Sequence, residues 1–202
     1  MKKILLLLSA VTGAVLFSCH RPAVFSGEEN ALIHQGTAQT PFRVLQITGT
    51  QDSVILRTPC SDIENFANDS TLALLVARLK TTLAAENGVG IAAPQVGLSR
   101  NIFLFMRLDL PDEPVTVAIN PKIINHPDTV VCFVRDGCLS IPGVSGNSVR
   151  YPWVEVEYCN EKGECIRERL DGYSRQDTFT AVIFQHEYDH TRGILFIDKL
   201  CH

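Results

Sequence analysis

The sequence predicts an α+β fold in which antiparallel β-sheets wrap around a helix near the carboxyl terminus. Short apolar runs rich in β-branched residues predict strands, and a helix containing Gln-His-Glu-Tyr-Asp-His at 185–190 follows them. A helix packed against such sheets is an α+β arrangement. The predicted strands cover residues 101–106, 115–120, 129–134, 154–158 and 166–170.

The first 18 residues have the pattern of a secretion signal. Lys2 and Lys3 precede an apolar stretch over 4–17, which is too short for a spanning helix. Cys19 follows Leu-Phe-Ser and resembles a bacterial lipoprotein cleavage site, where the cysteine takes a lipid. We expect a signal peptide over 1–18, a lipidated tether over 19–42 and one folded domain over 43–202. The protein would then be exported and anchored through Cys19 to a bacterial membrane, facing the periplasm or the cell exterior.

Composition excludes some partners and indicates a compartment. The formal net charge is −4 and no basic cluster occurs, which argues against nucleic acid as a partner. Seven cysteines fit an oxidising compartment better than the cytosol. Cys159 and Cys165 flank a predicted hairpin loop. Their positions allow either a disulfide or two free thiols, and the sequence favours neither. The pairing of Cys60, Cys132 and Cys201 stays open, and at least one of them should be free or buried.

A helix is predicted before the first strand, and a small-residue segment follows it. Asn68, Asp69 or Ser70 can cap the helix, whose apolar residues recur at helical spacing until Asn87-Gly88. The next residues, Gly88-Val89-Gly90-Ile91-Ala92-Ala93-Pro94-Gln95, let a peptide backbone approach closely, and Gln95 adds a neutral amide donor. The segment lacks the Lys-Ser/Thr of a phosphate-binding loop.

The motif helix and one cysteine predict a metal site. His186 and His190 are four residues apart, so both imidazoles lie on one face of a helix, with Glu187 beside them as a possible general base. Asp177 is expected to cap this helix. No third histidine or glutamate follows at a known ligand spacing, so we expect the third ligand upstream, at Cys138 in Asp-Gly-Cys-Leu-Ser. A Cys-His-His site leaves one position open, as catalytic metal sites do, and suits Zn(II) or Fe(II).

Three segments, 88–95, 136–140 and 186–190, resemble the signature motifs of the peptide deformylases, in the same order. The resemblance runs from about Arg43 to Lys199. It implies a peptide deformylase-like fold and a metal-dependent hydrolase that removes the formyl group from N-formylmethionyl peptides. It implies iron as the metal in the cell, whereas an oxidising exterior favours redox-silent zinc.

The resemblance also assigns roles to single residues. Cys138, His186 and His190 would hold the metal, and Glu187 would shuttle protons. Gln95 and the backbone N–H of Leu139 would face the developing oxyanion. The positions facing the substrate would be Gly90, through its backbone, and Ile91, Val134, Asp136, Val182 and Ile183.

Two positions depart from the family pattern. Asp136 stands where glutamate is commoner, and we expect it to hydrogen-bond toward Gln95 or its loop. Ser145 stands where many relatives have an arginine that helps to hold the peptide, so we expect weaker peptide binding. Arg150 matches a position that pairs with the helix aspartate, here Asp189.

Three functions therefore remain in view. The first is a deformylase acting on N-formylated peptides. The second is an extracytoplasmic metalloamidase acting on another N-acyl or peptide substrate. The third is a non-enzymatic peptide-binding lipoprotein that has kept the pocket.

Overall fold

The computed structural model describes residues 24–201. The expected signal peptide and Cys19 lie outside the described residues. The sheets are entirely antiparallel: one has the order β1-β2-β3-β6-β7, and β4 pairs with β5 in the other. The elements are α1 (Gly27–Ile33), α2 (Thr50–Leu56), α3 (Ser70–Ala85), β1 (Gly90–Ala92), the 3-10 helix η1 (Ala93–Val96), β2 (Ile102–Met106), β3 (Val115–Asn125), β4 (Val131–Cys138), β5 (Ile141–Arg150), β6 (Trp153–Cys159), β7 (Cys165–Asp171), α4 (Thr180–His190) and the 3-10 helix η2 (Phe196–Lys199).

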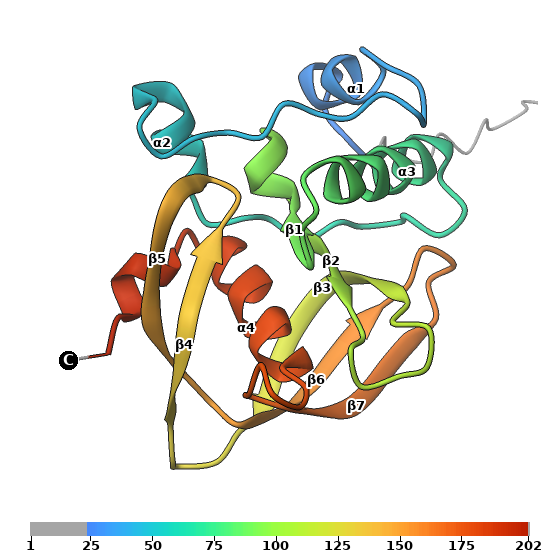
Figure 1. Cartoon of the computed structure of the whole chain (residues 1–202). Coiled ribbons are helices and arrows are strands. Elements are labelled where there is room, and N and C mark those ends of the chain that lie inside the picture. The colour runs from blue at the N-terminus through green and yellow to red at the C-terminus, as the bar shows by residue number, and fades with distance from the viewer. Residues whose placement is uncertain (1–23, 202) are drawn as a thin grey trace, which may run out of the picture.

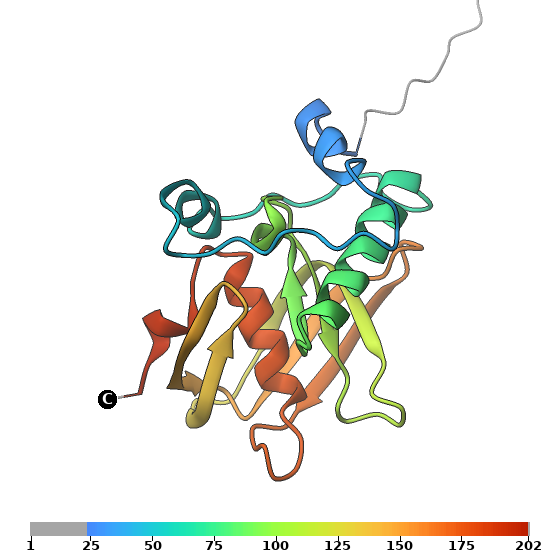
Figure 2. The same ribbon diagram turned by 45° about the horizontal axis from the view of Figure 1, so that its top comes forward.

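Helix α4 occupies the centre of this arrangement. It lies between the five-stranded sheet and the β4-β5 pair (Figure 1), while α3 covers the opposite face of the larger sheet (Figure 2). Helix α1 packs beside α3, and α2 lies beside η1. The predicted α+β class, with antiparallel sheets around the motif helix, is confirmed. Among residues 24–201, no helix is both long and apolar enough to span a bilayer.

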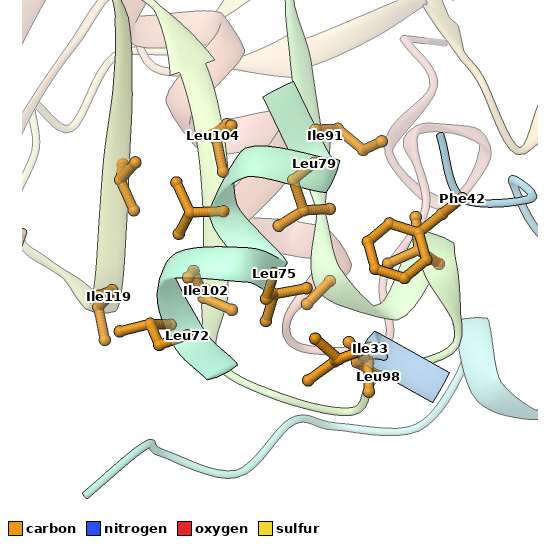
Figure 3. Packing of buried hydrophobic residues seen from close by; sticks show 14 of the residues in the cluster. Ile33, Phe42, Leu72, Leu75, Leu79, Ile91, Leu98, Ile102, Leu104 and Ile119 are labelled. Carbon is orange, nitrogen blue, oxygen red and sulfur yellow. The ribbon is translucent and has the colours of Figure 1, made fainter. Parts of the chain in front are cut away.

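Strand β2 is buried on both faces, which explains its unbroken apolar sequence. Successive side chains of a strand point to opposite faces. Ile102 and Leu104 therefore pack against α3 (Figure 3), whereas Phe103 and Phe105 pack with Phe184 of α4. A fully buried leucine, isoleucine or phenylalanine contributes about 1.5–3 kcal/mol, so β2 ties the two helices to one sheet.

Helix α3 forms where the sequence predicts it. Asp69 is the N-cap, and its side chain accepts a hydrogen bond from the backbone N–H of Leu72 at 2.8 Å. The face that carries Leu72, Leu75 and Leu79 is buried against the sheet (Figure 3). The prediction for α4 was less accurate, because the helix begins at Thr180 with Phe179 at the N-cap and no side-chain cap. Asp177 therefore does not cap it.

The expectation of a tether up to residue 42 is wrong for residues 24–42. Ser26 and Glu29 form a capping box that starts α1, and Phe25 and Ile33 are buried in the cluster around α3. Glu29 also forms an ion pair with Arg100, with an Nε–Oε1 distance of 2.6 Å. The apolar side chains in this stretch thus join the core, although its glycines and prolines suggested a linker.

Two disulfides occur among the described residues. Cys159 and Cys165 form a disulfide across the ends of β6 and β7, which was one of the two alternatives left open by the sequence. Cys132 on β4 pairs with Cys201, which links the carboxyl-terminal segment to the sheet that carries Cys138. Cys60 and Cys138 form no disulfide among the described residues.

Candidate metal centre and active site

Helix α4 carries three of the functional side chains and is buried along almost its whole length. Apolar neighbours on both sides, including Ile183 and Phe184, fix its position between the sheets. Because His186 and His190 are one turn apart, their rings lie on the same face, with centroids 5.1 Å apart. Glu187 is 4% exposed, so its carboxylate is also inside the protein.

Cys138, at the end of β4, meets these two histidines. Its Sγ lies 3.2 Å from Nε2 of His190, and one ligand atom from each of Cys138, His186 and His190 lies within 4.8 Å of the others. Ligands bound at ~2.0–2.3 Å around a tetrahedral metal are themselves roughly 3.3–3.8 Å apart. One thiolate and two imidazoles at these separations fit a divalent metal of the zinc or ferrous type.

A buried charge network orients the first of these histidines. Asp136 Oδ1 lies 3.1 Å from Nδ1 of His186 and fixes the ring. Its other oxygen accepts hydrogen bonds from Ser148 Oγ at 2.5 Å and from Arg150 Nη2 at 2.8 Å. Arg150 Nη1 donates to Asp189 Oδ2 at 2.6 Å, which confirms the predicted pair. A carboxylate behind a ligating histidine sets its tautomer and strengthens its binding to a metal.

The surroundings shift the pKa values of Cys138, Asp136 and Glu187. Burial favours the neutral thiol of Cys138, but the two adjacent imidazoles outweigh it and lower the pKa well below the usual value. Burial also disfavours ionised Asp136, yet His186 and Arg150 hold the pKa of this carboxyl below its normal range. For Glu187 burial prevails and raises the pKa to about 7. The lowered pKa of Cys138 favours the thiolate, the form that binds metals, and a pKa of about 7 suits Glu187 to exchange a proton near neutral pH.

Gln95 completes the site from η1. Its Oε1 accepts a hydrogen bond from the N–H of Ala92 at 2.8 Å, so its amide nitrogen is turned toward the site. That Nε2 lies 3.6 Å from Cys138 Sγ and 3.3 Å from Ser140 Oγ. The carbonyl of Leu139 accepts from Gln46 Nε2 at 3.2 Å, which fixes the peptide next to Cys138.

A cavity of about 370 Å³ opens in front of these groups. His186, Glu187, Cys138 and Gln95 line it together with Gly90. The remaining walls are mainly apolar, as is usual for small-ligand sites, and include Phe133, Leu139, Ile141, Phe179, Val182 and Ile183.

Known proteins resemble this chain in sequence and fold. The profile of the family described as polypeptide deformylase matches residues 44–202. Peptide deformylase 2 of Nostoc sp. is 39% identical over 151 residues, covering 72% of this chain and 80% of that relative. The chain belongs to the peptide deformylase family.

Solved structures agree with this assignment. The peptide deformylase of Thermotoga maritima superposes with a TM-score of 0.69 at 31% identity, covering 80% of this chain and 99% of that one. A class I type b peptide deformylase from Acinetobacter baumannii with Met-Ala-Ser bound gives 0.69 at 30% identity, with coverages of 80% and 99%. Peptide deformylases are metal-dependent enzymes, and the Cys-His-His group offers the matching site.

Not every residue expected at the substrate is in the deformylase pocket. Gly90, Val182 and Ile183 line it, but Ile91 does not. The Ile91 side chain is fully buried against α3 (Figure 3), because it faces the side of β1 opposite to Gly90. Val134 is 49% exposed and lies outside the pocket lining.

A bulge in β4 explains the error at Val134 and the direction of the Asp136 carboxylate. The pairing with β5 shifts between Phe133 and Asp136, and Arg135 has a φ of +54°. The extra residue changes the alternation, so Phe133 points inward in place of Val134. Asp136 borders the pocket, but its carboxylate is bound to His186, Ser148 and Arg150 rather than to Gln95 or a substrate. Regular alternation counted back from Cys138 would have placed Val134, and not Phe133, at the pocket.

Gly90 leaves the space that the Glu187 carboxylate occupies. A Cβ at residue 90 would lie 2.8 Å from both Cγ and Cδ of Glu187, a separation that forces the carboxylate to move. Gly90→Ala should therefore lower kcat about a hundredfold, as expected when a reacting group is misplaced by about 1 Å, with little change in metal content. The matched control is Gly137→Ala, whose Cβ would meet nothing closer than 3.8 Å. Equal kcat for the two variants would contradict this role.

Proposed function

We propose that this chain is an active metal-dependent deformylase that removes the formyl group from N-formylmethionyl peptides. The observation that carries the proposal is the buried Glu187 carboxylate beside a Cys-His-His group at the bottom of an apolar pocket. Oε2 of Glu187 has no hydrogen-bond partner among residues 24–201, so it is free to accept a proton from a reactant.

The residues divide the chemistry between them. Cys138, His186 and His190 would hold the metal, which when bound supplies the Lewis acidity that lowers the pKa of a water from about 16 toward 7. Glu187 accepts a proton from the water that attacks the formyl carbon and returns it to the departing amine. Gln95 Nε2 and the N–H of Leu139 donate hydrogen bonds to the formyl oxygen as it gains negative charge. Val182, Ile183 and Phe179 surround the methionine side chain.

The direct test measures formate release from formyl-Met-Ala-Ser by the purified protein, together with its metal content. Acetyl-Met-Ala-Ser is the parallel substrate and distinguishes a deformylase from an amidase of wider acyl range. We expect formate release and little acetate release. Metal-loaded protein that hydrolyses only the acetyl peptide would support the amidase, and protein that hydrolyses neither would support a binding protein.

We further propose that the protein is exported and anchored by a lipid on Cys19. The charged and apolar start with Leu-Phe-Ser-Cys at 16–19 supports it, as do two disulfides in the folded domain, because disulfides persist in oxidising compartments. In a bacterial host, Cys19→Ala should move the protein out of the membrane fraction and remove the lipid mass from the mature amino terminus. An unchanged fraction and mass would contradict the anchor.

Outside the cytoplasm, we propose Zn(II) as the native metal. Fe(II) suits the same ligands, but its oxidation is a liability in an oxidising compartment, whereas zinc has no redox chemistry. Elemental analysis of protein purified from the exported fraction without added metal tests this choice. Iron at one equivalent would overturn it.

The Cys132–Cys201 disulfide should stabilise the exported form. It joins residues 69 apart in sequence, and loops of this length gain about 4 kcal/mol in the chain-entropy model, with about 2–4 kcal/mol typical of measurements. Replacing both cysteines by alanine should therefore lower the free energy of unfolding by about 2–4 kcal/mol in urea titrations. Cys60→Ala is the control, because Cys60 forms no disulfide among the described residues. Burial raises the pKa of its thiol to about 12, so it stays protonated in the assay. Equal stability of the two proteins would contradict the prediction.

A further inference from the structure

The guanidinium of Arg175 is fixed at the rim of the substrate pocket. Arg175 lies in the loop between β7 and α4, and its side chain lines the cavity. Nε donates to the carbonyl of Val134 at 3.2 Å and Nη2 to that of Arg135 at 2.9 Å. The carbon Cζ lies 4.9 Å from the ring centroids of both Phe133 and Phe179. Two carbonyls and two aromatic rings therefore hold this exposed side chain in one orientation.

This positioned cation has no anionic partner within the described part of the chain. No carboxylate of residues 24–201 lies within ion-pairing distance of Arg175, and its Nη1 makes no hydrogen bond there. Arg100 and Arg150, by contrast, are each bound by carboxylates. An arginine that is held in place with donors to spare is preorganised to bind an oxyanion, because little side-chain entropy remains to be lost.

Arg175 is the one exposed positive charge in the described pocket lining that a carboxylate can meet. Within residues 24–201, Arg175 is the only arginine or lysine that lines the pocket. Asp136 and Glu187, the acidic residues of the lining, are each 4% exposed and engaged deeper in the site. The cavity, about 370 Å³, is near the lower end of the usual ~300–1,000 Å³ for small-ligand pockets. A cavity of this size has room for the first residue of a bound peptide, so the residues that follow it would leave the cavity past its rim, where Arg175 lies.

We propose that Arg175 binds a substrate carboxylate on the carboxyl-terminal side of formylmethionine, so that short formylated peptides with a free carboxylate there are preferred. This inference rests on the proposed deformylase function and deepens it. The carboxylate is either the carboxyl terminus of a di- or tripeptide or an acidic side chain at the same distance, and both present the same two oxygens to the guanidinium.

The experiment compares kcat/KM for four peptides with the metal-loaded protein. Formyl-Met-Ala-Ser is measured against its carboxyl-terminal amide, and formyl-Met-Ala-Glu-amide against formyl-Met-Ala-Gln-amide. For the wild type we expect an acid-to-amide ratio of about ten, mostly through KM, because a charge-assisted hydrogen bond at a partly exposed site has about that effect. A similar Glu-to-Gln ratio would show that a side-chain carboxylate also binds, and a Glu-to-Gln ratio near one would restrict recognition to the terminus.

Two variants separate recognition from general electrostatics and from folding. Arg175→Gln should bring the acid-to-amide ratio close to one. Arg135→Gln removes the same charge from the adjacent, exposed strand residue outside the pocket lining, and should keep the wild-type ratio. Thermal unfolding of both variants shows whether they are folded.

The outcomes distinguish this inference from the function that it rests on. Formate release with an acid-to-amide ratio near one in the wild type, or a ratio unchanged by Arg175→Gln, overturns the role of Arg175 and leaves the deformylase standing. No formate release from any of the four peptides overturns both.

Discussion

Glu187→Gln should lower kcat for formyl-peptide hydrolysis by about a thousandfold while the protein keeps its metal. General acid–base catalysis by a positioned side chain contributes roughly 10²–10⁴, and no other carboxylate can replace Glu187, because Asp136 is bound to His186 and Arg150. Glutamine has the same shape, so the helix and the ligand geometry remain. The measurement is kcat with formyl-Met-Ala-Ser alongside metal content by elemental analysis.

The control for this variant is Glu157→Gln, which alters a half-exposed carboxylate on β6 outside the pocket. It should retain wild-type kcat and metal. A Glu187→Gln protein with full metal content and wild-type kcat would exclude Glu187 as the proton carrier. If the variant instead loses its metal, Glu187 contributes to metal binding, and the loss of activity no longer tests proton transfer alone.

The parts of the fold that sequence could predict depend on local patterns. Helix α3 has an N-cap at Asp69 and regular apolar spacing, and β2 has an unbroken apolar run, so both were predicted within a few residues. Strand β5 was missed, because Gly143 and Gly146 interrupt a polar, mostly exposed sequence. Its residues form a strand because they pair with β4. Such pairing between two segments produces no alternation of apolar and polar residues in the sequence of β5, so sequence patterns could not reveal the strand.

The metal ligands could be predicted because chemistry restricts them to few residue types at fixed spacing. His186, His190 and Cys138 do meet in space. The orientation of side chains around them could not be predicted, because it follows from the bulge at Arg135. That bulge turns Asp136 toward His186 and aims the carbonyls of Val134 and Arg135 at Arg175. Arg175 itself carries no sequence signal, since a loop arginine gains meaning only from what it touches.

Arg150→Met should destabilise the fold by about 3–5 kcal/mol, the usual cost of removing one partner from a buried ion pair. The Arg150 side chain has no exposed surface and lies between Asp136 and Asp189. Methionine fills most of the volume but leaves Asp136 with only Ser148 and His186, and Asp189 with Lys199, which is 2.6 Å away. Urea titration of the metal-free protein measures the loss directly.

The same substitution should weaken metal binding about 10- to 100-fold, since Arg150 holds the carboxylate that orients His186. Arg43→Met is the matched control: Arg43 makes a two-pronged ion pair with Asp52, but its side chain is 69% exposed, and exposed pairs contribute little. Adding Asp189→Asn to Arg150→Met should recover part of the lost stability, because a neutral amide costs less to bury than a carboxylate that has lost the guanidinium and keeps only Lys199. A single Arg150→Met variant as stable as Arg43→Met would mean that the two aspartates tolerate burial without the guanidinium. Ser148, which donates to Asp136, would then have to hold this carboxylate against His186.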